Sequence, residues 1–257
     1  MKTTFYSLFL GLAAAVTSVF APSLWAAEVE AAPITYVIPI KGMMESAMLY
    51  TVRLGFKRAQ EAKADAIVFH MDTPGGAVMV VEDFIRRIIN LPDNVKTYTF
   101  VDTDALSAGA LMALATDEIY MSPGSRIGAS ALVTITGDIA EGETKEKAVS
   151  ATLALVTSAA MKKGHDPALL RAMVRRDAGY KIGEEEICRK GELLTLGYDM
   201  AARMVERDGK SLPLLSKGTV KTLDEMLAKI GRAKGKVIHL ELSPSEKMAR
   251  YVKLFSV

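Results

Sequence analysis

The residues best placed to do chemistry are a pair of glycines and a serine, at two successive points where a predicted strand gives way to a helix. The turn Thr73–Gly76 follows an apolar run and precedes a helical pattern, and Gly75 and Gly76 let the backbone approach a ligand closely. The next helix adds a positive dipole end, so the turn suits an oxyanion. The ordinary alternative is a plain strand-to-helix turn, because no phosphate-binding glycine signature is present there.

Ser107 opens the next predicted helix, and the three residues that follow it, Ala108–Ala110, are small. A serine at the start of a helix is most often only an N-cap. Small neighbours leave a substrate room to reach its hydroxyl, however, and the N–H of Ala108 is placed to donate to the same oxyanion as the glycine turn. We therefore interpret Ser107 as a candidate nucleophile.

A nucleophilic serine needs a base. No histidine has a catalytic setting: His70 lies inside a predicted strand, His165 in a polar turn expected at the surface, and His239 near the C-terminus. A lysine can serve as the base where burial lowers its pKa. Lys145 and Lys147 begin a long predicted helix, and both are candidates, the alternative being a solvated charge at a helix start.

The elements that must position these residues alternate through the first half of the chain. Apolar runs predict strands at 34–40, 64–72, 95–102 and 118–123, and the spacing between them predicts helices at 44–64, 80–91 and 106–117. Such alternation is typical of an α/β fold with a mostly parallel sheet.

The second half of the chain is less regular. We expect a loop at 131–142, helices at 145–163, 167–175, 199–208 and 220–230, a strand or loop at 181–190 and a strand at 236–242. With no internal repeat and no linker, residues 27–257 are interpreted as one domain.

Composition excludes several classes of protein. The chain has 257 residues, 50% of them hydrophobic and 24% charged, which is enough to bury a core without a metal or a disulfide. A net charge of +2 with no basic block argues against nucleic acid as a partner. A single cysteine, Cys188, excludes an intrachain disulfide and a multi-cysteine zinc site, and we expect no metal and no cofactor.

Residues 1–26 are interpreted as a secretory signal peptide. Lys2 supplies a positive start, the apolar run Leu8–Ala21 is shorter than the ~20 residues that span a bilayer, and cleavage is expected after Ala26. The alternatives are a buried helix and an uncleaved anchor. We expect an exported, periplasmic protein, membrane-associated if the segment is retained.

Four segments carry a resemblance to known proteins: His70–Gly76, Leu106–Ala110, Ile119–Ala129 and Lys190–Leu196. Together they resemble the NfeD family of ClpP-class, membrane-associated serine proteases, which is distantly similar to signal peptide peptidase A. The resemblance runs from about Tyr36 to about Leu227.

The resemblance implies the ClpP/crotonase-like fold, a spiral of ββα units with a mostly parallel sheet, and a Ser–Lys dyad. Ser107 matches the position of the family nucleophile and Lys147 that of the general base, with Lys145 as the runner-up. The pair Gly75–Gly76 and Ala108 match the positions whose N–H groups bind the oxyanion and the substrate.

The function implied is that of an exported serine endopeptidase that hydrolyses peptide bonds in apolar segments of membrane-associated proteins. The resemblance also implies a stomatin-like membrane protein as a partner, and assembly into homo-oligomers. One alternative is a non-catalytic, peptide-binding adaptor or scaffold with the same fold. An acyl-CoA enzyme of the crotonase type is disfavoured, because export separates the chain from cytosolic CoA.

Two departures from the family pattern have consequences. Residues Ala77–Met79 are apolar where family members often carry a charged or polar residue, which we expect to alter substrate preference or an oligomer contact. Long NfeD proteins continue into membrane spans and a small β-barrel, whereas this sequence ends at Val257. We therefore expect a short form without those parts, attached to a membrane through a partner or its leader.

Overall fold

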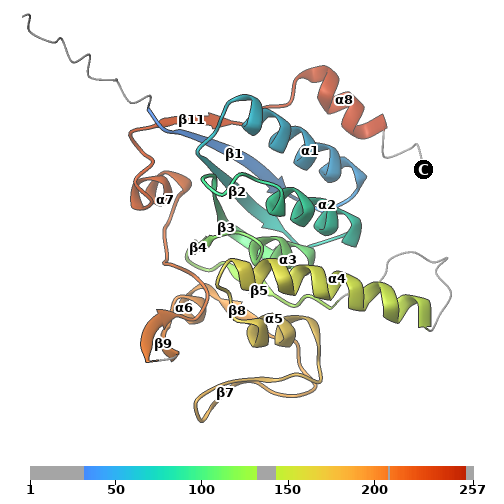
Figure 1. The fold of residues 1–257 in the computed structure, drawn as a ribbon, viewed down its shortest axis with the longest axis vertical. Coiled ribbons are helices and arrows are strands. Elements are labelled where there is room, and N and C mark those ends of the chain that lie inside the picture. Colours follow the sequence, from blue (N-terminus) through green and yellow to red (C-terminus); the bar gives the residue numbers. More distant parts are fainter. Residues whose placement is uncertain (1–31, 132–142, 208, 253–257) are drawn as a thin grey trace, which may run out of the picture. The chain divides into compact units, whose positions relative to one another are not determined.

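Helices alternate with strands through the first half of the chain, as the apolar pattern predicts (Figure 1). The computed structural model describes residues 32–131, 143–207 and 209–252. The predicted signal peptide and nearly all of the loop expected at 131–142 lie outside the described residues.

A seven-stranded sheet organises the described part of the chain, in the order β11-β1-β2-β3-β5-β8 with β4 also pairing with β3. Its strands are β1 (Ile34–Lys41), β2 (Ala66–Thr73), β3 (Lys96–Leu106), β4 (Glu118–Met121), β5 (Arg126–Gly128), β8 (Thr195–Gly197) and β11 (Lys236–His239). Every pairing is parallel except that of β5 with β8. Because β2 and β3 are parallel neighbours, the glycine turn and Ser107 follow them at the same edge of the sheet.

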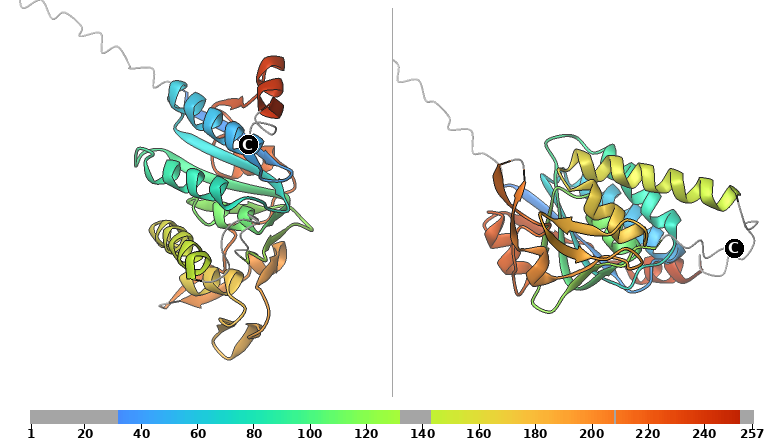
Figure 2. Two further views of the ribbon diagram at one scale, coloured as in Figure 1. Left: turned by 90° about the vertical axis from the view of Figure 1, so that its right-hand side faces the viewer. Right: turned by 90° about the horizontal axis from the view of Figure 1, so that it is seen from below.

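Helices cover both faces of this sheet (Figure 2). They are α1 (Ser46–Glu61), α2 (Val78–Ile89), α3 (Ala108–Ala113), α4 (Glu143–Lys162), α5 (Pro167–Val174) and α7 (Leu223–Lys229). On one face, Phe69 of β2 packs against Phe56 of α1 and Phe84 of α2, with ring centroids 5.6 and 4.7 Å away. On the other face, Met226 of α7 joins a smaller cluster around Val68.

The remaining elements are short. They are the hairpin β6 (Tyr180–Ile182) and β7 (Glu185–Cys188), helix α6 (Tyr198–Ala201), the hairpin β9 (Met204–Arg207) and β10 (Lys210–Pro213), and helix α8 (Pro244–Val252). Helix α8 is joined to α1 by an ion pair of 2.7 Å between Glu246 and Arg58.

The helix predicted at 199–208 is wrong in its second half. Only α6 is helical, and Met204–Arg207 form the strand β9. Gly209 adopts a φ of 70°, a left-handed conformation that suits a hairpin turn, and β10 returns antiparallel to β9. Pairing with β10 therefore makes this segment a strand, although the sequence pattern indicated a helix.

Candidate active site

The glycine turn after β2 packs directly against Ser107. Gly75 and Gly76 have φ values of 110° and 149°, which few other residues adopt. A Cβ atom on Gly75 would lie 2.5 Å from the Cβ of Ser107, and one on Gly76 would collide with the backbone of Met44. Both positions therefore need glycine for space as well as for conformation.

The hydrogen bonds of this turn fix where its N–H groups point. Met44 donates its N–H to the carbonyl of Gly75 at 2.8 Å, and its own carbonyl accepts the N–H of Ala77 at 2.7 Å. Since successive N–H groups of an extended chain point in opposite directions, the N–H of Gly76 points away from Met44, toward the side on which β3 lies. Within the described chain, that N–H has no acceptor.

The two glycines are not equivalent as donors. The N–H of Gly75 donates to the hydroxyl of Thr73 at 3.1 Å, and that hydroxyl donates to the carbonyl of Gly42 at 2.7 Å. The N–H of Gly75 is thus used in building the turn, which leaves Gly76 as the glycine whose N–H is available to a ligand.

Ser107 occupies a strained turn between β3 and α3. Its φ is 50° and its ψ is −119°, a conformation that costs a non-glycine residue about 1–3 kcal/mol and is concentrated at functional sites. Its side chain makes no capping hydrogen bond to α3, so the ordinary role of a serine at this place is not observed. Ser107 is partly exposed, and its hydroxyl lies beside the glycine turn.

Ala108 is the first residue of α3, so its N–H has no acceptor within the helix. It follows Ser107 directly, and the pairing of Thr73 with Ala105 brings the glycine turn beside it. The structure therefore brings together three of the predicted features, namely a serine hydroxyl and the N–H groups of Gly76 and Ala108. Such donors stabilise the oxyanion of an acyl-transfer intermediate.

The predicted base, Lys147 or Lys145, lies in helix α4. Lys147 is exposed. The side chain of Lys145 lies outside the part of the chain whose side chains are described. The choice between the two lysines therefore stays a prediction.

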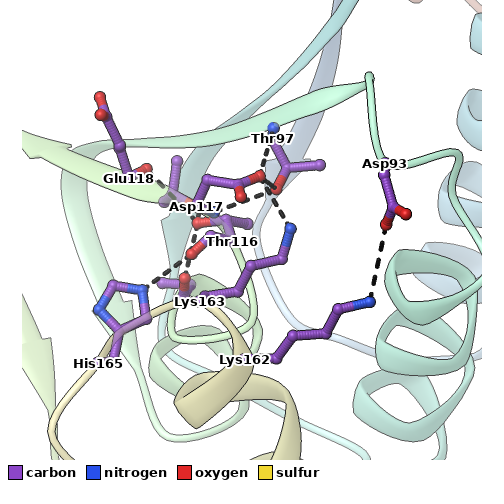
Figure 3. Close-up of polar contacts among 10 residues, drawn as sticks. Asp93, Thr97, Thr116, Asp117, Glu118, Lys162, Lys163 and His165 are labelled. Carbon is purple, nitrogen blue, oxygen red and sulfur yellow. Dashed lines mark hydrogen bonds and ion pairs between the residues drawn. The ribbon is translucent and has the colours of Figure 1, made fainter.

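Polar contacts at the C-terminal end of helix α4 attach this helix to the sheet (Figure 3). Lys163, just after α4, places its ammonium 2.9 Å from Asp117, whose carboxylate also accepts the N–H of Thr97 at 2.8 Å. Burial raises the pKa of Asp117, but the hydrogen bonds from Thr97 and Lys163 outweigh it and lower the pKa overall. Near the middle of α4, the hydroxyl of Thr152 donates to the carboxylate of Glu82 in α2 at 2.6 Å.

His165, which was expected at the surface, is half-buried. Its Nε2 lies 2.8 Å from the carbonyl of Thr116, because the turn after α4 folds back over the end of α3 (Figure 3). Burial lowers its pKa, so the ring is neutral at pH 7 and Nε2 donates to the carbonyl.

His70 contacts Asp102 and Phe100. Its Nε2 lies 2.8 Å from Asp102, and its ring packs 5.3 Å from that of Phe100. It makes no hydrogen bond to Ser107, so no Ser–His pair forms there. Among the described residues, no group of three or more histidine, cysteine or acidic side chains is arranged to hold a metal ion.

Residues 34–240 match the family model described as the N-terminal domain of NfeD1b. The chain belongs to the NfeD1b family. It is 33% identical to the membrane protein NfeD1b of Bacillus subtilis (strain 168) over 245 residues, which is 94% of this chain and 52% of that protein. It is 26% identical to the membrane-bound protease PH1510 of Pyrococcus horikoshii over 195 residues, 74% of this chain and 43% of that protein. The chain thus spans about half the length of these curated relatives.

Solved structures show the same fold. A serine-to-alanine variant of the 1510-N membrane-bound stomatin-specific protease matches with a TM-score of 0.60 and 21% identity, covering 83% of this chain and all of that one. A lysine-to-alanine variant in complex with a substrate peptide matches with a TM-score of 0.62 and 21% identity, covering 86% and 98%. The NfeD1b-family domain described here therefore has the ClpP-like protease fold, which confirms the α/β prediction. None of its described helices is both long and apolar enough to cross a membrane.

Proposed function

We propose that this NfeD1b-family chain is a serine endopeptidase whose nucleophile is Ser107. The observation that carries the proposal is the strained backbone of Ser107, packed against Gly75 with its hydroxyl left out of the helix cap. A serine held in this way beside two N–H donors without acceptors has the parts that acyl transfer requires.

In the proposed reaction, the hydroxyl oxygen of Ser107 attacks the carbonyl carbon of a peptide bond. The N–H groups of Gly76 and Ala108 donate to the oxyanion that forms. The base takes the proton of the hydroxyl and then gives it to the departing amine, and water hydrolyses the acyl-enzyme. Losing one oxyanion donor typically costs about 10²–10³ in rate.

We assign the base to Lys147, with Lys145 as the alternative. Lys147 is exposed in α4, and in the proposed reaction bound substrate covers its amine beside Ser107. Covering the amine removes it from water, which favours the neutral form that accepts a proton. Support comes from the family neighbour, for which a serine and a lysine were each replaced by alanine.

The substrate is proposed to be an apolar segment of a membrane-associated protein. Met79, at the start of α2, is 56% exposed, and Met43, beside the Met44 backbone that holds the turn, is 53% exposed. Together with Ala77 and Val78 they give the rim of the site an apolar, adaptable surface. The neighbour 1510-N is described as stomatin-specific and membrane-bound, and a stomatin-like partner is proposed here as well.

The remaining predictions are part of the same proposal. The chain is exported to the periplasm after cleavage following Ala26, or stays membrane-associated through an uncleaved segment, and it assembles as a homo-oligomer. No metal or nucleotide takes part in the proposed steps.

Labelling with a fluorophosphonate tests the nucleophile. The mature protein is expected to react at Ser107, located by mass spectrometry, and to cleave an apolar peptide. Ser107→Ala is expected to abolish both activities, whereas Ser158→Ala, which removes an exposed serine of α4, is expected to retain them. Intact cleavage in Ser107→Ala would disprove the assignment.

A non-catalytic peptide-binding adaptor is the second candidate, and the observation that favours it is the exposed position of Lys147. An adaptor would bind an apolar peptide in the same place without cutting it and without reacting with the fluorophosphonate. Peptide binding measured by fluorescence anisotropy, combined with absent labelling, would support this candidate over the protease.

A further inference from the structure

The peptide group between Ser107 and Ala108 has a side-chain partner outside its own helix. Ser130, two residues after β5, donates its hydroxyl to the carbonyl of Ser107 at 3.0 Å, and the same hydroxyl lies 3.3 Å from the carbonyl of Gly128. Ser130 is only 1% exposed. A buried hydroxyl this close to the candidate nucleophile needs a structural explanation.

The segment that carries Ser130 is itself fixed on both sides. The N–H of Ser130 donates to the carbonyl of Met173 in α5 at 2.8 Å, and the N–H of Ala129 donates to the carbonyl of Leu194 at 2.9 Å. Gly128 accepts the N–H of Ser107 at 2.8 Å. The backbone of Ser107 is therefore held at its N–H by Gly128 and at its carbonyl by Ser130.

The direction of one end of a peptide group determines that of the other. In a planar trans peptide, the carbonyl and the following N–H point in opposite directions. The carbonyl of Ser107 and the N–H of Ala108 belong to one such group, so a donor that holds this carbonyl also aims the Ala108 N–H. That carbonyl further accepts the N–H groups of Ala110 at 3.1 Å and Leu111 at 3.4 Å, both from α3.

We propose that Ser130 is a positioning residue that aims the Ala108 N–H at the oxyanion and holds Ser107 in its strained conformation. The inference rests on the proposed function and deepens it, because it adds to the site a residue that never touches the substrate. Ser130 acts through the peptide group between Ser107 and Ala108. Its effect is therefore expected on the rate of reaction at Ser107 and not on the affinity for substrate.

The test compares Ser130→Ala with Ser125→Ala. Ser125 is a matched control, since it is also 1% exposed and its hydroxyl donates to a backbone carbonyl, that of Ser122, at 2.7 Å. Ser130→Ala is expected to slow fluorophosphonate labelling and kcat by about ten- to a hundredfold, less than the loss of an oxyanion donor outright, with KM changed by less than about twofold. Ser125→Ala is expected to keep the wild-type rates within about twofold. Equal rates in the two variants would overturn the proposal.

Hydrogen exchange gives a readout that does not depend on catalysis. Peptides covering residues 106–114 are expected to exchange faster in Ser130→Ala than in Ser125→Ala and the wild type, because the nucleophile turn has lost one of its anchors. If the wild type neither labels nor cleaves, the proposed function fails, and the exchange measurement alone decides whether Ser130 holds the turn. Unchanged exchange would overturn that role.

A variant that keeps the shape of the side chain guards against misfolding. Ser130→Cys retains a similar volume and a weaker donor, so it is expected to label at a rate between those of Ser130→Ala and the wild type. If Ser130→Ala does not fold, the comparison of Ser130→Cys with Ser125→Ala replaces it. A Ser130→Cys protein that labels at the wild-type rate would then contradict the proposal.

Discussion

Gly75 and Ser107 are in such close contact that a side chain on the first would occupy the space of the second: a Cβ on Gly75 would lie 2.5 Å from the Cβ of Ser107. The contact joins the end of β2 to the end of β3, and it depends on a residue without a side chain. The candidate nucleophile is thus positioned by the neighbouring strand as well as by its own.

Gly75→Ala is expected to remove activity beyond its effect on stability. Gly124→Ala is the matched control, because Gly124 also has a positive φ, 86°, but nothing lies within 4 Å of the added Cβ. Both variants are expected to lose roughly 1–2 kcal/mol of unfolding free energy from backbone strain, and Gly75→Ala more through its collision with Ser107. Labelling of folded Gly75→Ala is expected to fall by about a hundredfold or more. Similar labelling rates in the two variants would contradict the close contact.

The ion pair at the end of α4 is expected to stabilise the fold. Lys163→Met leaves the Asp117 carboxylate without its cation, and both side chains are mostly shielded from water, at 16% and 23% exposure. The expected loss is about 1–3 kcal/mol in urea unfolding, less than for a fully buried pair because both groups keep some contact with water.

Lys162→Met is the control for that prediction. Lys162 lies 3.9 Å from Asp93, and both of these groups are well exposed. Its replacement is expected to leave the unfolding midpoint unchanged. Equal effects of the two lysine variants would mean that the contact with Asp117 adds no stability.

Acid is expected to destabilise the protein partly through His165. Burial and the charges of Lys217 and Lys163 lower the pKa of this histidine below 6.5, while the Thr116 carbonyl and Asp117 oppose that shift. Below pH 6.5 this histidine binds a proton in the unfolded chain but not in the folded chain. The free energy of unfolding therefore decreases as the pH is lowered from 6.5 to the lower pKa of the folded state.

His165→Gln keeps a donor for the Thr116 carbonyl but does not titrate. It is expected to flatten the dependence of unfolding free energy on pH just below 6.5, as measured by urea unfolding at a series of pH values. A His165→Gln slope equal to that of the wild type would disprove this role.

Met79 is expected to contribute to substrate binding and not to the chemical step. Met79→Ser should raise KM for an apolar peptide by roughly three- to tenfold with little change in kcat, because the lost contact is the same in ground and transition states. Met204→Ser is the control, since Met204 in β9 is equally exposed, at 57% against 56% for Met79. Unchanged KM in Met79→Ser would exclude this methionine from the binding surface.

The sequence was most informative where structure follows from local pattern. The strands β1–β3 are long and buried, so their apolar runs predict them well. The three-residue strands β5 and β8 are too short to show a period, and β9 depends on pairing with β10. Prediction there would have required knowledge of the partner strand.

Similar reasoning separates the parts of the site. The contact of the glycine turn with Ser107 was predictable, because glycine pairs and small residues after strands mark close backbone approach. Ser130 lies 23 residues from Ser107 and meets it only through the pairing of β5 with β3. No sequence motif follows Ser130, so the sequence does not indicate that contact. The proposed role of Lys147 depends on where its ammonium lies relative to the Ser107 hydroxyl, which the sequence pattern does not encode.

The glycine–serine contact also determines how the site responds to thermal motion. The N–H of Gly76 and the hydroxyl oxygen of Ser107 lie on either side of the contact between Gly75 and Ser107, which joins the ends of two neighbouring strands. A fluctuation that tilts this edge of the sheet would carry both groups along as a unit, so the spacing between the Gly76 N–H and the Ser107 oxygen would be preserved. In the proposed mechanism, this constant spacing would keep the oxyanion donor aligned with the nucleophile.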